Sequence, residues 1–186
     1  MPAAAECETE AGRTERPAIV KVWDPFVRIF HWSLVALFAL AWVSEDLQSL
    51  HQPVGYAILG LVVLRVFWGF VGPRYARFSD FVRSPKAIFA YGRDLLAGRA
   101  PRCRGHNPLA AVMVLALLTM LIATGTSGWM MTLNAYRSAE WLEELHEGLA
   151  SVTLGLVSLH VLAVAVMSLV HGENLVRAMI TGCKRT

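Results

Sequence analysis

Four long runs of apolar residues divide the chain, and charged residues are almost confined to the segments between them. The runs extend from Ile29 to Ser44, from Leu47 to Pro73, from Asn107 to Tyr136 and from Gly148 to Gly172, and the only charge inside them is Arg65. A helix rises about 1.5 Å per residue, so these runs approach or exceed the roughly 30 Å apolar core of a bilayer. The pattern predicts an all-α integral membrane protein, a four-helix bundle. We expect its spans at about 27–46, 50–72, 107–132 and 143–171.

Composition supports a membrane protein. Of the 186 residues, 55% are hydrophobic and only 17% are charged, with a mean hydropathy of +0.48, whereas a soluble domain of this length needs more charge on its surface. Residues 1–18 differ from the rest because they mix small residues with Glu and Arg and lack the apolar segment of a signal peptide. We expect 1–18 to be a disordered cytoplasmic tail and 19–186 to form the membrane domain.

Charges in the connections predict the orientation of the helices. The segment between the second and third spans has a large excess of basic residues: Arg74, Arg77, Arg83, Lys86, Arg93, Arg99, Arg102 and Arg104, against Asp80 and Asp94. The two short connections are acidic, with Glu45 and Asp46 in one, and Glu140, Glu143, Glu144 and Glu147 against Arg137 in the other. Because basic loops stay in the cytoplasm, both termini and the long loop are predicted there. The short connections are then expected to face the periplasm or the equivalent outer side of the membrane.

Apolar residues also recur along the long middle loop, and aromatic residues stand among its basic ones. This pattern predicts a short amphipathic helix over roughly Pro85–Ala97, lying in the cytoplasmic interface between the second and third spans. A solvated loop is the alternative.

Three cysteines, Cys7, Cys103 and Cys183, are too far apart for a CxxC motif. Their spacing excludes a zinc or thioredoxin-like motif, and the absence of CxxCH excludes a covalently attached c-type haem. Three free thiols are expected.

Histidines are the candidate functional residues, because an ionisable side chain inside a membrane is costly and marks function by default. His146 and His160 are 14 residues apart, which puts them about 21 Å apart along one helix and only about 40° apart around it. They therefore point from the same face at two levels. His51 lies near the outer surface of the membrane, at the same depth as His146. His31 lies near the cytoplasmic surface, at the same depth as His160.

Two facing histidines at one level of a helical bundle are what a bis-histidine haem requires. The sequence therefore predicts two haem b groups, with iron ligands His51 and His146 at the outer level and His31 and His160 at the cytoplasmic level. Interfacial histidines with ordinary hydrogen bonds are the alternative. That alternative is favoured for His106 and His171, although the cytoplasmic edge around His106, Asn107 and His171 is also a candidate quinone site.

Two further residues are candidate cofactor contacts. Arg65 follows His51 by 14 residues, so it shares that face about 21 Å deeper, where its guanidinium could pair with a haem propionate. Snorkelling to the cytoplasmic head groups is the alternative for Arg65. Gly55 is one turn from His51, and its missing side chain would admit the edge of a macrocycle or permit close helix contact.

Several stretches carry a family resemblance: WDPFVRIFHW at Trp23–Trp32, LHQPVGY at Leu50–Tyr56, RVFWGFVGPRYARFSDF at Arg65–Phe81, GHNPLAA at Gly105–Ala111, LHEGLA at Leu145–Ala150 and HGENLVRAMITG at His171–Gly182. With them the chain resembles the bacterial cytochrome b561 family, including the cytochrome b subunits of nickel-iron hydrogenases and formate dehydrogenases. The resemblance implies four membrane helices, two haems b, and electron exchange with quinone or a redox partner. The family's axial-ligand pattern falls on His31, His51, His146 and His160.

Three functions compete. The first is electron transfer between the quinone pool and a partner such as a periplasmic c-type cytochrome, a dehydrogenase or a hydrogenase, with the acidic outer connections as a docking surface. The second is a superoxide oxidase that reduces quinone, ranked lower because an anionic substrate is expected to need a basic outer face. The third is a non-redox membrane bundle. We expect the protein to contact the lipid bilayer and not nucleic acid. The sequence decides neither whether it is an enzyme nor whether it forms a homodimer.

Overall fold

The computed structural model describes residues 7–8, 19–82, 84–99, 102–103, 107–136, 138–170 and 172–185. The chain divides into two compact units. The first unit comprises Met1–Arg28, Trp68–Val114 and Leu162–Thr186. The second comprises Ile29–Phe67 and Leu115–Val161, and it contains all four histidines that the sequence pairs.

Four long helices dominate the described residues: α1 Pro25–Val43, α2 Gln48–Val71, α5 Pro108–Met131 and α6 Glu140–Val170. Each is long and apolar enough to cross a membrane. The predicted fold class, an all-α bundle of membrane helices, is therefore confirmed, and the helix bounds lie within about three residues of the expected spans.

The largest differences from the expected spans have local causes. α1 ends at Val43 rather than near residue 46 because the chain turns there, with the Leu47 amide donating to the Ser44 carbonyl at 2.9 Å. α6 begins at Glu140, earlier than residue 143, and Glu140 and Glu143 stand in its first turn. Carboxylates stabilise a helix N-terminus by interacting with its dipole, so these charges extend the helix beyond its apolar run.

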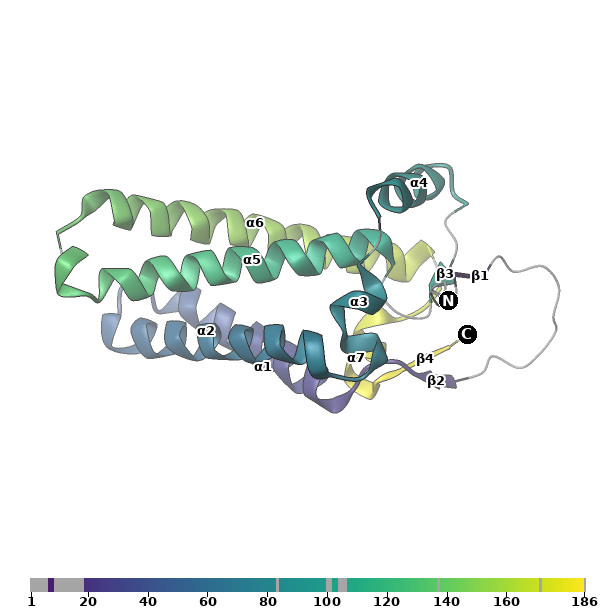
Figure 1. Ribbon diagram of the computed structural model, residues 1–186, viewed down its shortest axis with the longest axis horizontal. Helices are drawn as coiled ribbons and strands as arrows, with labels where there is room; N and C mark the ends of the chain where they lie inside the picture. The colour runs from purple at the N-terminus through teal and green to yellow at the C-terminus, as the bar shows by residue number, and fades with distance from the viewer. Residues whose placement is uncertain are drawn as a thin grey trace. The chain divides into compact units, whose positions relative to one another are not determined.

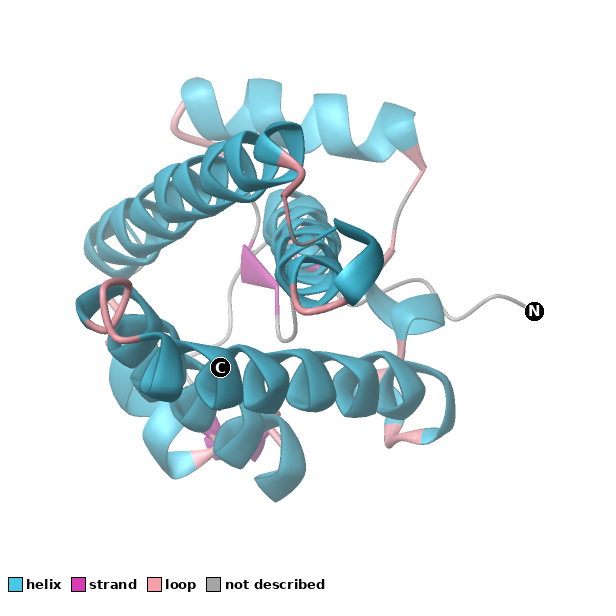
Figure 2. Cartoon of the chain, turned by 90° about the vertical axis from the view of Figure 1, so that its left-hand side faces the viewer, coloured by secondary structure: helices cyan, strands magenta, loops and turns pink. Residues whose placement is uncertain are grey.

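In the second unit, α1 runs to α2 and α5 runs to α6 as two antiparallel hairpins. The short connections after α1 and after α5 lie at the same end (Figure 1), and Figure 2 views the chain from that end. The connection after α5 includes a 3₁₀ turn, Asn134–Tyr136. The Tyr56 hydroxyl on α2 donates to Thr132 Oγ1 at 3.0 Å, which ties the two hairpins together close to this end.

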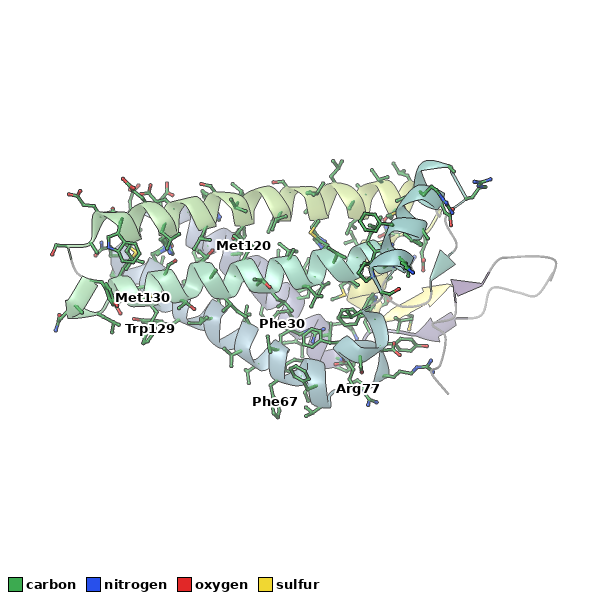
Figure 3. All side chains as sticks on the ribbon, turned by 45° about the horizontal axis from the view of Figure 1, so that its top comes forward. Phe30, Phe67, Arg77, Met120, Trp129 and Met130 are labelled. Carbon is green, nitrogen blue, oxygen red and sulfur yellow. The ribbon has the colours of Figure 1, made fainter. Side chains whose placement is uncertain are left out.

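The second unit buries a narrow core and exposes most of its large apolar side chains. Val54, Ile58 and Val62 recur every four residues on the buried face of α2, and Leu142 on α6 is completely buried. Outward-facing residues include Phe67, which is 60% exposed and points away from its helix in Figure 3. Soluble monomers rarely expose apolar surfaces this extensive, so the outer surface fits contact with lipid.

The first unit holds short elements. They are a 3₁₀ turn at Arg74–Ala76, helices α3 Phe78–Phe81, α4 Pro85–Leu96 and α7 Leu175–Thr181, and strands β1 Cys7–Glu8, β2 Ile19–Lys21, β3 Arg102–Cys103 and β4 Cys183–Arg185. β1 pairs antiparallel with β3, and β2 with β4. The sequence did not predict these strands, which are too short for a period-two pattern. Apart from Cys7–Glu8, the predicted disordered tail over 1–18 lies outside the described residues.

Helix α4 bears out the prediction of a short helix in the middle loop. The Ser84 hydroxyl caps it by accepting from the Ala87 amide, and Pro85 occupies the first helical position. Tyr91 is buried against the start of α5, where it bonds the Asn107 side chain, and burial raises the pKa of Tyr91. Phe89 is 79% exposed, as expected of a helix that inserts an aromatic face into a membrane interface.

Candidate functional site

Four histidines of the second unit face one another as two pairs. His51 on α2 faces His146 on α6, with ring centroids 6.3 Å apart and ring planes 83° apart. His31 on α1 faces His160 on α6, with centroids 6.4 Å apart and planes 60° apart. The structure thus brings together the same side chains that the sequence pairs by depth: α1 and α2 contribute one histidine each, and α6 contributes two.

The separation of each pair matches that of two imidazoles on opposite sides of one metal ion. With metal–nitrogen bonds of about 2 Å and about 1.1 Å from a ring nitrogen to the ring centre, such centroids stand about 6.2 Å apart. Within the described residues, no three His, Cys, Asp or Glu side chains gather as a metal site of their own. Two protein ligands per ion suit a haem, because the macrocycle supplies the remaining four.

Hydrogen bonds at the first pair fix which ring nitrogen is available. His51 Nδ1 lies 3.0 Å from the Ala41 carbonyl oxygen, and His146 Nδ1 lies 3.1 Å from the Thr124 carbonyl oxygen. A carbonyl only accepts, so each Nδ1 carries the proton and each Nε2 keeps a free lone pair. Metal-bound histidines characteristically donate their second nitrogen to a carbonyl in this way, and both residues therefore fit axial ligands.

His146 also rests against a part of α5 that sequence reasoning missed. Ser127 Oγ lies 3.0 Å from His146 Nδ1, and a Cβ added at Gly128 would stand 2.9 Å from the ring Cε1. The missing side chain at Gly128 therefore makes room for the imidazole. Neither a backbone carbonyl nor a glycine in an apolar run carries a sequence signal, so α5 offered no candidate.

His31 has a different environment. Its Nδ1 is buried, and no group among the described residues forms a hydrogen bond with it. The ring meets Trp32 edge to face, at 5.2 Å between centroids and 89° between planes. The two pairs therefore share a spacing but differ in the polar groups behind their ligands.

The other predicted site residues are placed as follows. Arg65 on α2 is only 3% exposed, so its side chain is buried rather than on the surface. A Cβ at Gly55 would meet nothing within 4 Å, which leaves space beside His51 but no contact to interpret. Asn107 caps α5 by accepting from the Ala110 amide at 2.7 Å. His106 and His171, the other residues of the candidate quinone site, lie outside the described residues.

Apolar helices that enclose facing imidazoles characterise membrane b-type cytochromes. A family model described as prokaryotic cytochrome b561 matches residues 22–182. The chain therefore belongs to the prokaryotic cytochrome b561 family: it is a multi-pass membrane protein that binds haem b and takes part in electron transfer. Comparison with curated proteins and with solved structures gave no significant match.

Proposed function

We propose that this protein transfers electrons across the bacterial inner membrane through two bis-histidine haems b, between the quinone pool and a redox partner. The observation that carries the proposal is the pair of matched centroid distances, 6.3 Å for His51–His146 and 6.4 Å for His31–His160. Bound haem supplies a one-electron iron couple, and the protein supplies its ligands, orientation and electrostatic surroundings.

The positions of the pairs on α6 support transfer across the bilayer. His146 and His160 are separated by 14 residues of continuous helix, or about 21 Å of a roughly 30 Å apolar core. One pair is therefore close to each membrane surface. Buried Val54 and Ile58 follow His51 along α2, and buried Leu142 lies one turn before His146 on α6, so apolar side chains neighbour the ligands of this pair along both helices.

Arg65 and Gly55 have supporting roles in the proposal. Arg65 follows His51 by 14 residues on α2, so it is at the depth of the His31–His160 pair, and its guanidinium would hold a haem propionate by charge-assisted hydrogen bonds. At Gly55 the absence of a side chain would admit the edge of the macrocycle held by His51.

The charge of the connection after α1 and of the first turns of α6 supports the orientation and one class of partner. Glu45, Asp46, Glu140, Glu143, Glu144 and Glu147 are all exposed, at the end of the second unit where both connections lie (Figure 1). The positive-inside rule puts this acidic end on the outer side, with the basic middle loop and both termini in the cytoplasm. An acidic surface there suits docking of a basic c-type cytochrome.

The two other candidate functions agree less well with the charge of the outer side and with the family. Superoxide is an anion, and the acidic outer end would repel it rather than guide it to the haem, so a superoxide oxidase is disfavoured. A non-redox bundle does not agree with membership of an electron-transfer cytochrome family.

Haem content of purified variants tests the proposal. The wild type is expected to bind two haems b per chain and to show a reversible reduced-minus-oxidised b-type spectrum, and His146→Ala and His160→Ala should each lose one haem. His106→Ala is the matched control and should retain both. A wild type with one haem, or two haems in both His146→Ala and His160→Ala, would overturn the proposed ligation.

A further inference from the structure

The hydrogen-bond environment of His146 differs from those of His51 and His31. His51 Nδ1 has a backbone carbonyl as its acceptor, and His31 Nδ1 has none among the described residues. His146 Nδ1 has two neighbours, the Thr124 carbonyl at 3.1 Å and Ser127 Oγ at 3.0 Å. A side-chain hydroxyl therefore faces the ring from α5, a helix that has no histidine in the described residues.

The direction of each hydrogen bond at Ser127 follows from its geometry. Ser127 Oγ lies 2.9 Å from the Thr124 carbonyl, which can only accept, so the hydroxyl proton points there. The oxygen lone pairs of Ser127 are then left to accept from His146 Nδ1–H. Ser127 is only 3% exposed, so water does not compete for this bond. The proton on Nδ1 is shared between two acceptors, and the ring is fixed in both tautomer and rotation.

We infer that Ser127 is a positioning residue for His146, which fixes the rotation of the imidazole and raises its basicity toward the iron. This inference rests on the proposed function, in which His146 ligates haem. A stronger acceptor at Nδ1–H increases the electron density that Nε2 donates, and ferric iron gains more from that donation than ferrous iron. Ser127 therefore lowers the midpoint potential of the haem held by His51 and His146.

The same contacts predict an electronic difference between the two haems. Both ligands of the His51–His146 pair donate Nδ1–H to a carbonyl, and one of them has the Ser127 hydroxyl in addition. In the other pair His31 lacks such a bond among the described residues. The haem of the His51–His146 pair is therefore the one with the more negative midpoint potential, and Ser127 contributes to the gap.

Redox titration of Ser127→Ala, followed by optical and electron paramagnetic resonance spectra, tests the inference. The midpoint potential of one haem should shift in the positive direction and its low-spin signal should change, because the angle between ligand planes affects the iron d orbitals. The other haem should be unchanged. Ser127→Thr restores a hydroxyl and should return the potential toward that of the wild type. Ser151→Ala, which removes an exposed serine of α6, is the control and should change neither haem.

The outcomes separate this inference from the proposed function. If the wild type binds two haems and His146→Ala loses one, but Ser127→Ala has wild-type potentials and spectra, Ser127 has no positioning role and the ligation stands. If His146→Ala keeps both haems, the ligation itself is wrong. Should Ser127→Ala not accumulate in the membrane, Ser127→Thr and Ser127→Cys provide the comparison: a potential that does not follow the hydrogen-bonding strength of the side chain overturns the inference.

Discussion

Thr124 on α5 and Thr153 on α6 join their helices through a hydrogen bond between side-chain hydroxyls, with 3.2 Å between the two oxygens. Thr153 Oγ1 donates to the Leu149 carbonyl at 2.7 Å, so it accepts from the Thr124 hydroxyl. Thr153 is completely buried, two turns after His146 along α6. Since the Thr124 carbonyl also accepts from His146, this bond holds the acceptor in place relative to the helix that carries the ligand.

Thr153→Val tests the strength of this link, because valine has nearly the shape of threonine without its hydroxyl. The substitution leaves the half-buried Thr124 hydroxyl without its acceptor, and we expect a loss of about 1 kcal/mol of stability, typical of a hydrogen bond between membrane helices. The measurement is the temperature of haem loss in detergent, which should fall by a few degrees. Thr181→Val, at the end of α7, is the control and should leave that temperature unchanged; equal effects in both variants would contradict the prediction.

Gly128→Ala tests the space that α5 leaves for His146. The added Cβ would stand 2.9 Å from the ring Cε1 and 3.3 Å from Nδ1, so the imidazole or the helix must shift. We expect loss of one haem, or conversion of its low-spin spectrum, with the other haem retained. Pyridine haemochrome assay and optical spectra of the purified protein measure both.

Gly125→Ala is the matched control for that substitution. It makes the same chemical change one turn earlier on α5, where the new methyl group meets Leu59 Cδ1 at 3.1 Å. A leucine side chain can move by a few tenths of an ångström, so both haems should remain. If Gly128→Ala also keeps two haems with wild-type spectra, the close approach of α5 to His146 has no functional consequence.

The sequence was sufficient to predict the helices and the partners within each histidine pair. Long uncharged runs predict membrane helices almost regardless of tertiary structure, and a 14-residue spacing fixes two side chains on one helix face. The residues behind the ligands were not predictable. Ala41 and Thr124 act through backbone carbonyls, which every residue has, and Ser127 and Gly128 are ordinary small residues of a membrane helix. Only the packing of α1 against α2 gives Ala41 a role, and only that of α5 against α6 gives one to Thr124, Ser127 and Gly128.

Arg65→Gln tests the proposed propionate contact. Removing a buried positive charge beside a haem destabilises its reduced form relative to its oxidised form, since reduction adds negative charge. We expect the midpoint potential of the His31–His160 haem to shift in the negative direction, by an amount on the order of 1 kcal/mol per electron. Arg65→Lys keeps the charge and should shift it less. A shift confined to the His51–His146 haem, or none in either, would show that Arg65 does not contact the predicted propionate.

Neutralising exposed carboxylates in the first turns of α6 tests the docking surface. The double substitution Glu143→Gln and Glu144→Gln removes two exposed carboxylates, and attraction between opposite charges accelerates encounter with a basic partner. We expect electron transfer to a basic c-type cytochrome to slow several-fold at low ionic strength and to approach the wild-type rate at high salt, because salt screens these charges. Stopped-flow oxidation of the prereduced protein measures the rate.

Asp94→Asn on α4 is the control, because it also removes a carboxylate, but on the side predicted to be cytoplasmic. It should leave the rate unchanged in membrane vesicles whose predicted outer side faces the solution. Equal slowing by both changes would mean that net charge, rather than this surface, governs the encounter.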